Sequence, residues 1–167
     1  RDREVAMVRT NVEAVVDLCS TFVPGMVARG AGAVLNVAST AAFQPLPGQA
    51  GYAASKAFVL SYSRALRAEL HGTGVTVTAL CPGPVETEFG DVATGSTGDV
   101  DAGMLPRFMW VPADDVARAA VEGLDRGRAV VIPGAANKFT ALAGQVTPRG
   151  LLVPLVARQH PALRRDG

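Results

Sequence analysis

Short apolar runs alternate with longer amphipathic segments along this chain, and the alternation constrains its fold more than any other feature. Three segments carry apolar residues at helical spacing: residues 4–28, 50–71 and 113–125. Three short apolar runs are predicted to be buried strands: residues 33–38, 75–80 and 129–132. Helices that alternate with strands predict an α/β fold of parallel βαβ units with right-handed crossovers.

Length and composition fit one globular domain with a reasonable core. The 167 residues are 49% hydrophobic, and 16 basic residues nearly balance 15 acidic ones. Neither a disordered segment nor a nucleic-acid-binding protein is therefore indicated. Cys19 and Cys81 lie in apolar segments without metal-ligand spacing, so we expect buried free thiols in a reducing cytoplasm and no metal site. We find no signal peptide and no run near the ~20 apolar residues of a membrane span, and we expect a cytoplasmic protein.

Tyr52 and Lys56 stand four residues apart in a predicted helix, and this spacing outlines an acid–base site. Residues i and i+4 share one face of a helix, so the Lys56 ammonium is expected near the Tyr52 hydroxyl. A neighbouring cation favours the phenolate form of a tyrosine, which suits proton exchange with an alcohol or carbonyl oxygen. Ser39 follows a predicted strand, at the edge where open α/β sheets bind ligands, and its hydroxyl could hold that oxygen.

Each of these residues also has a structural interpretation. Taken alone, Tyr52 and Lys56 fit an exposed aromatic residue and a solvated charge, and Ser39 fits a cap. The combination of the three favours a functional site. His71 and His160 have no carboxylate or cysteine at ligand spacing, so we interpret both as surface residues.

Four motifs occur in order and together resemble the second half of a short-chain dehydrogenase/reductase. They are M-V-R-T-N-V at residues 7–12, L-N-V-A-S at 35–39, Y-A-A-S-K at 52–56 and P-G-P-V-E-T at 82–87. The resemblance covers residues 4–134, and it implies the C-terminal part of a Rossmann-type, doubly wound parallel sheet in three α/β/α layers. Residues 135–167 would then form a C-terminal helical extension.

The resemblance also assigns roles to single residues. It implies a catalytic tetrad of Asn11, Ser39, Tyr52 and Lys56. Tyr52 would be the general acid/base and Ser39 would orient the substrate oxygen. Lys56 would support Tyr52 and bind the nicotinamide ribose. Asn11 would hold a helix kink and the water of a proton relay, although an Asn within a helix can also serve only as a cap or kink.

The turn after the second strand is the remaining part of the implied cofactor site. The resemblance places nicotinamide contacts, besides Tyr52 and Lys56, at four residues: Pro82, Gly83, Val85 and Thr87. A plain strand-ending turn is the alternative. The Gly-rich T-G-x-x-x-G-x-G turn that holds the pyrophosphate in this family is not found. We therefore expect the C-terminal part of a longer protein, which contacts only the nicotinamide end of NAD or NADP.

The implied activity is NAD(P)-dependent interconversion of an alcohol and a ketone or aldehyde. A Gly-rich segment at residues 90–103 is expected to be mobile. The apolar residues after it form either a substrate wall, which favours an apolar small-molecule substrate, or packing beneath the loop: Met104, Phe108, Met109 and Trp110.

A rival interpretation is a non-catalytic remnant that serves as an oligomerisation module. In the family, the helices equivalent to residues 4–28 and 50–71 pair two subunits, so a homo-oligomer is expected under either interpretation. Residues 138–160 mix apolar residues with Arg and Pro, and they fit a lid, an oligomer contact or an interfacial segment.

Overall fold

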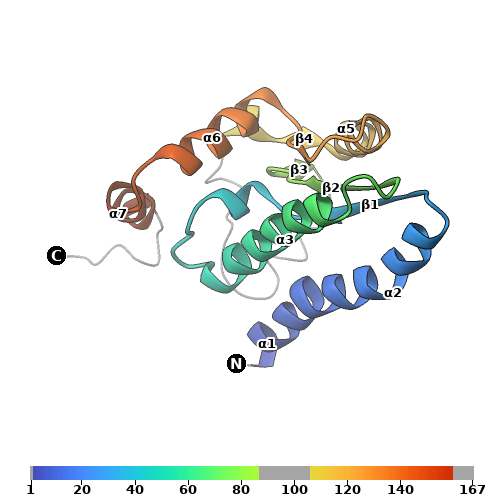
Figure 1. The fold of residues 1–167 in the computed structure, drawn as a ribbon. Coiled ribbons are helices and arrows are strands. Elements are labelled where there is room, and N and C mark those ends of the chain that lie inside the picture. The colour runs from blue at the N-terminus through green and yellow to red at the C-terminus, as the bar shows by residue number, and fades with distance from the viewer. Residues whose placement is uncertain (1, 87–105, 160–167) are drawn as a thin grey trace.

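The computed structural model describes residues 2–86 and 106–159 and confirms the predicted α/β class (Figure 1). Strands β1 (Gly32–Val37), β2 (Val75–Leu80) and β5 (Val130–Val131) form a parallel sheet in the order β1-β2-β5. β1 pairs with β2 along its full length, from Gly32 opposite Val75 to Val37 opposite Leu80. β5 pairs over two residues only. It is shorter than predicted, and Pro133, which lacks a backbone N–H, follows soon after.

Helices cover both faces of this sheet. α2 (Ala14–Ala28) and α3 (Ala50–Glu69) lie on one face, whereas α5 (Ala113–Asp125) lies on the other (Figure 1). On the first face a buried cluster joins α2, the end of α3 and β2: Cys19, Val23, Leu70, Val75 and Val77. On the second face another cluster joins α5 to β2 and β5: Leu80, Val116, Ala120 and Val131. Alternate residues of β2 thus serve opposite layers, which gives the three-layer arrangement.

The N-terminal helix is interrupted by a π-helical turn. α1 (Asp2–Val8) continues through η1 (Arg9–Glu13) into α2. The apolar spacing predicted one helix over residues 4–28, and the family resemblance implied a kink at Asn11, but the π turn itself was not predicted. Asn11 lies in the middle of the π turn. Such turns are rare, and many occur at functional sites.

The same helix corrects one expectation drawn from the sequence. From Asp2 to Ala28 it has 27 residues, and its most apolar 18-residue window reaches a mean hydropathy of 1.2. By length and composition alone it is therefore apolar enough to cross a membrane. The apolar window arises because most of the charged residues of the helix precede Asn11. A core helix of a soluble protein passes the same test. In this structure 11% of the window is buried, and Leu18 and Phe22 are among its exposed side chains.

Several short elements were not predicted. η2 (Thr40–Phe43) follows β1, and η3 (Arg107–Met109) precedes β4 (Val111–Pro112). β4 pairs in parallel with β3 (Val85–Glu86). This pairing joins segments far apart in the sequence, so local periodicity gives no sign of it.

The C-terminal segment forms two helices, α6 (Ala135–Val146) and α7 (Arg149–Gln159). α6 packs against η2, and its buried residues are Asn137, Ala141 and Gly144. The proposed boundary after residue 134 stays a prediction. The predicted mobile segment at residues 90–103, Thr87, Met104 and His160 lie outside the described residues.

Candidate functional site

Tyr52 and Lys56 lie in the first two turns of α3, as their spacing predicted. The Lys56 ammonium is 5.8 Å from the centroid of the Tyr52 ring. Lys56 Nζ also donates a hydrogen bond of 3.1 Å to the carbonyl of Val37, the last residue of β1. This bond ties α3 to the carboxyl end of the sheet. Burial lowers the pKa of Lys56, and the neighbouring Cys81 opposes the shift.

Cys81 directly follows β2, interacts electrostatically with Lys56 and is 0% exposed. Burial raises the pKa of its thiol to about 12, although Arg64, a hydrogen bond with the Ser39 backbone and Lys56 favour the thiolate. Cys81 therefore stays protonated at neutral pH and is no nucleophile. Cys19 is also a buried free thiol, so the expectation of two buried thiols is confirmed.

Ser39 links the carboxyl ends of β1 and β2. Its side chain caps η2 by accepting a hydrogen bond of 3.1 Å from the Ala41 backbone N–H. Its hydroxyl also donates to the carbonyl of Pro82, at a longer 3.4 Å. The Thr40 backbone N–H donates to the same carbonyl at 2.8 Å. The structure thus brings two predicted site residues together, and it also contains the cap that was the alternative role for Ser39.

Asn11 is connected to Tyr52 through a residue that the sequence analysis did not single out. Asn11 Nδ2 donates to Ser55 Oγ at 3.1 Å, and Ser55 Oγ donates to the Tyr52 carbonyl at 2.7 Å. Ser55 is buried. The only sequence signal for this role was its place inside Y-A-A-S-K, one turn after Tyr52. The two bonds fix the π turn against the start of α3.

The turn after β2 contains Pro82, Gly83 and Pro84 and leads into Val85 of β3. The Pro84 carbonyl accepts a hydrogen bond of 3.1 Å from the Val111 N–H, so this turn and β4 lie side by side. Gly83 packs directly on the side-chain amide of Asn137, where a Cβ would collide. The sequence analysis missed Asn137, which follows Pro133-Gly134 with no recognisable motif.

The apolar residues of the predicted substrate wall differ in their exposure to solvent. Phe108 is 75% exposed, whereas Met109 and Trp110 are half-buried beside the turn. The Met109 carbonyl accepts a hydrogen bond from Asn137. His71 is exposed, as predicted for a surface residue.

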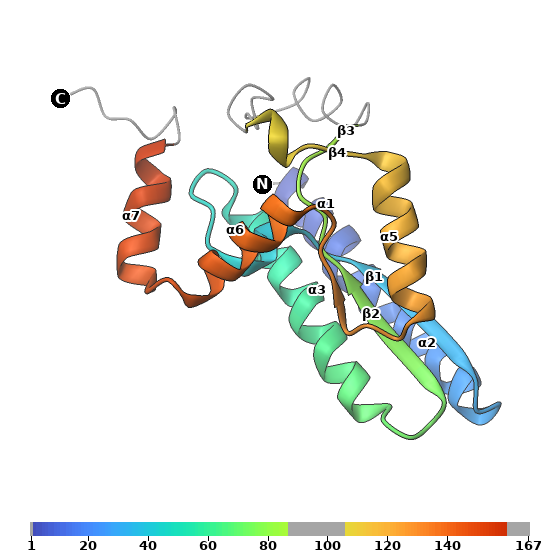
Figure 2. The ribbon, with the colours of Figure 1, turned by 90° about the horizontal axis from the view of Figure 1, so that it is seen from above.

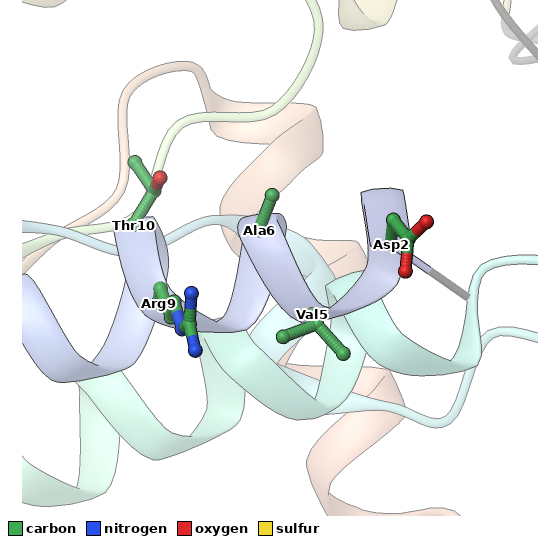
Figure 3. A pocket seen from close by; sticks show the side chains of 5 residues that line it. All are labelled: Asp2, Val5, Ala6, Arg9 and Thr10. Atoms are coloured by element: carbon green, nitrogen blue, oxygen red, sulfur yellow. The ribbon is translucent and has the colours of Figure 1, made fainter.

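A surface depression lies away from these residues. It is lined by residues of α1 and η1: Asp2, Val5, Ala6, Arg9 and Thr10 (Figure 3). None of the predicted site residues lines it, and the Asn11 side chain bonds to Ser55 instead. We therefore place the candidate site at the carboxyl ends of β1 and β2, where open α/β sheets bind their ligands.

Comparison with known proteins agrees with this fold. The family model described as short chain dehydrogenase matches residues 2–95. The chain therefore belongs to the short-chain dehydrogenase family.

Two curated relatives illustrate the similarity. Sulfoacetaldehyde reductase 2 of Chromohalobacter salexigens is 39% identical over 112 residues, which cover 66% of this chain and 44% of that protein. Serine 3-dehydrogenase of Rhizobium radiobacter is 37% identical over 111 residues, with coverages of 66% and 44%. The chain thus spans less than half the length of these relatives.

Solved structures show the same likeness. A short chain dehydrogenase from Burkholderia cenocepacia J2315 in complex with NADP has a TM-score of 0.71 and 25% identity, covering 92% of this chain and 60% of that one. A short-chain dehydrogenase from Sphingobium yanoikuyae in complex with NADPH has a TM-score of 0.66 and 31% identity, with coverages of 94% and 57%. These neighbours support NAD(P) use in general.

Proposed function

We propose that the whole protein is an NAD(P)-dependent oxidoreductase that interconverts an alcohol with a ketone or aldehyde. The observation that carries the proposal is the placement of Tyr52 beside the Lys56 ammonium, with Ser39, at the carboxyl ends of two parallel strands. Because the chain spans less than half of its curated relatives, the activity is assigned to the whole protein.

The residues present fit the nicotinamide end of the cofactor. Lys56 supplies a cation that burial has partly desolvated. The Pro82-Gly83-Pro84 turn supplies backbone, and its Pro82 carbonyl accepts a hydrogen bond from Ser39. Tyr52, Val85 and Thr87 complete the proposed contacts. When bound, a nicotinamide supplies hydride exchange with the substrate carbon.

The proton chemistry belongs to the chain's own residues. In the reduction direction, the Tyr52 hydroxyl gives its proton to the substrate oxygen, and in oxidation the phenolate takes it back. The Lys56 ammonium lies beside the Tyr52 ring, 5.8 Å from its centroid. The bond from Ser39 to the Pro82 carbonyl is long at 3.4 Å, so the hydroxyl can exchange this weak partner for the substrate oxygen. Asn11 contributes by holding the helix turn that supports Tyr52 through Ser55.

The substrate class remains a proposal. Met109 and Trp110 support an apolar substrate, whereas the names of the relatives refer to sulfoacetaldehyde and serine. We propose a small apolar ketone or aldehyde, and a panel that also contains small acidic aldehydes tests it. The whole protein is incubated with NADH or NADPH and each carbonyl, and absorbance of the reduced nicotinamide is followed.

Oxidation of either cofactor that depends on the carbonyl is the expected result. A Ser39→Ala variant should retain cofactor oxidation at a reduced rate, with Ser61→Ala on the exposed face of α3 as its control. Absence of carbonyl-dependent oxidation across the panel by the wild-type protein would overturn the proposal.

The 167-residue chain alone is expected to bind NAD(P)H weakly, because its sequence lacks the Gly-rich turn. Fluorescence titration tests this, and micromolar affinity would contradict it.

Exposed apolar residues favour an additional role as an oligomer surface. On the helices at residues 4–28 and 50–71 they are Val5, Val8, Leu18, Phe22, Val27 and Phe58. β1 is also an edge strand of the sheet among the described residues, and its Val37 is exposed. We propose a homo-oligomer through these helices. Light scattering should show an oligomer for the wild type and a larger fraction of monomer for Leu18→Glu. A wild-type protein that is monomeric at micromolar concentration would refute the proposed homo-oligomer.

A further inference from the structure

Asn137 is a fully buried polar side chain that bonds to two separate segments. It occupies the first turn of α6 and is 0% exposed. Its Nδ2 donates to the Met109 carbonyl at 3.0 Å and to the Pro133 carbonyl at 3.1 Å. One amide therefore holds the end of η3 and the exit from β5. Because both acceptors are backbone carbonyls, the side chain at position 137 must donate hydrogen bonds as well as fill the space.

The other side of the amide lies against the Pro82-Gly83-Pro84 turn. A Cβ at residue 83 would collide with the Asn137 amide, so only glycine allows this approach. Asn137 Oδ1 faces this turn and has no hydrogen-bond partner within residues 2–86 and 106–159. A buried acceptor without a partner costs about 1–3 kcal/mol. An apolar side chain would avoid that cost, so packing alone does not account for an asparagine here.

The two segments that meet at Asn137 are the two proposed walls of the candidate site. The turn carries Pro82, whose carbonyl accepts the Ser39 hydroxyl. The other wall is Met109 with its neighbour Trp110. The segment leading from β5 into α6 runs beside β2 (Figure 2). Asn137, in the first turn of α6, bonds to the Met109 carbonyl and packs against Gly83. Besides Asn137, the pairing of β3 with β4 over two residues joins these walls.

We propose that Asn137 is a positioning residue: its amide bonds to the Met109 carbonyl and packs against Gly83, and so sets the spacing between the Met109–Trp110 segment and the Pro82-Gly83-Pro84 turn. It touches neither Tyr52 nor Lys56. Its effect on substrate and cofactor binding rests on the proposed function, whereas the fastening itself can be tested without any activity.

Trp110 is the only tryptophan of the chain and follows Met109 directly, so its fluorescence reports on the fastened wall. Asn137→Leu keeps the branched shape of the side chain, although its methyl groups are bulkier, and removes the donor. Asn137→Ala is the second variant, used should leucine prevent folding. Lys138→Ala, on the exposed face of the same helix, is the matched control. Helix content from circular dichroism checks that each variant folds.

Acrylamide quenching of Trp110 is measured first, on the 167-residue chain. We expect the quenching constant of the Asn137 variants to rise by about twofold or more, as for a segment freed by local opening. The Lys138→Ala value should match the wild type. Folded Asn137 variants with unchanged quenching would overturn the proposal.

Kinetics of the whole protein then separate positioning from mere stability. We expect KM for substrate and for NAD(P)H to rise by about fivefold to tenfold, equivalent to one lost hydrogen bond, while kcat changes less. Raised quenching with unchanged KM in an active protein would show that Asn137 only stabilises the fold, and would overturn the positioning role. An inactive wild type would defeat the proposed function instead, and the quenching result would still decide whether Asn137 fastens the walls.

Discussion

The candidate site has two sides that are built in different ways. Its chemical side consists of Ser39, Tyr52 and Lys56, which follow one another through β1, η2 and α3 and meet through the bond from Lys56 to the Val37 carbonyl. Its holding side consists of Gly83, Met109 and Asn137, which come from three distant segments and meet at one buried amide. The residues of the proposed chemistry are thus close together in the sequence, whereas the residues around them meet only through long-range contacts.

The largest effect should come from the chemical side. Tyr52→Phe in the whole protein removes the proton donor, and we expect turnover to fall by about 10²–10⁴-fold with the fold intact. Oxidation of NAD(P)H by the best carbonyl of the panel is the measurement. Tyr62→Phe is the matched control, because Tyr62 lies on the same helix and stacks on Phe58 at 5.8 Å. Near wild-type turnover in Tyr52→Phe would show that Tyr52 is not the proton donor.

On the holding side, Gly83→Ala should act through stability. The new methyl group would collide with the Asn137 amide, and overpacking of this kind costs about 1–3 kcal/mol. Urea unfolding measures the loss, and Gly150→Ala is the control, because no atom lies near the added group there. In the double variant with Asn137→Ala the two losses should be less than additive, since the colliding amide is gone. Strictly additive losses in the free energy of unfolding would show that Gly83 and Asn137 act independently.

Asn11→Ala tests the connection between the π turn and the chemical side. It removes the bond to Ser55 Oγ, and we expect the free energy of unfolding to fall by about 0.5–1.5 kcal/mol. Thr21→Ala, an exposed position on α2, serves as the control. Equal stabilities of the two variants in urea would mean that the bond contributes nothing.

The smallest effect should be that of Lys56→Met on stability. Burial lowers the pKa of Lys56 in the folded chain below its ordinary value of 10.5, so the unfolded chain binds the proton more tightly. Between the lowered pKa and 10.5, the lysine therefore makes stability rise with pH. Near pH 7 we expect Lys56→Met to match or slightly exceed the wild type, within about 0.5 kcal/mol.

Urea unfolding from pH 7 to 10.5 checks this behaviour. The free energy of unfolding of Lys56→Met minus that of the wild type should fall as pH rises. The exposed control Lys138→Met should show no such trend. A variant that loses stability at pH 7 would indicate that the Val37 bond outweighs the cost of burying the charge.

The same division explains what the sequence could predict. α5 begins and ends as predicted, and α3 ends only two residues early, because long periodic segments leave little ambiguity. The full extent of β2 was predicted as well. Tyr52 and Lys56 share a helix face, so spacing alone placed them together. Their catalytic roles, like those of Asn11 and Ser39, stay predictions.

The holding side escaped prediction for a physical reason. The contacts of Asn137 depend on tertiary packing, and no local pattern distinguishes this asparagine from a surface residue. The pairing of β3 with β4 likewise joins two-residue strands that are too short to show a period. The π turn was missed because an amphipathic pattern does not reveal a change in hydrogen-bond spacing.

That π turn at Arg9–Glu13 has a consequence for how this helix tolerates length changes. Each residue of an α-helix advances the chain by about 100° around its axis, so the residue accommodated by the wider turn offsets α1 against α2. Deleting one residue there would restore a regular helix but rotate one half by that angle. Either Asn11 would then turn away from Ser55, or Cys19 and Val23 would leave the core. A one-residue insertion or deletion at this point is therefore a rotation of one helix half, and only the present length serves both contacts.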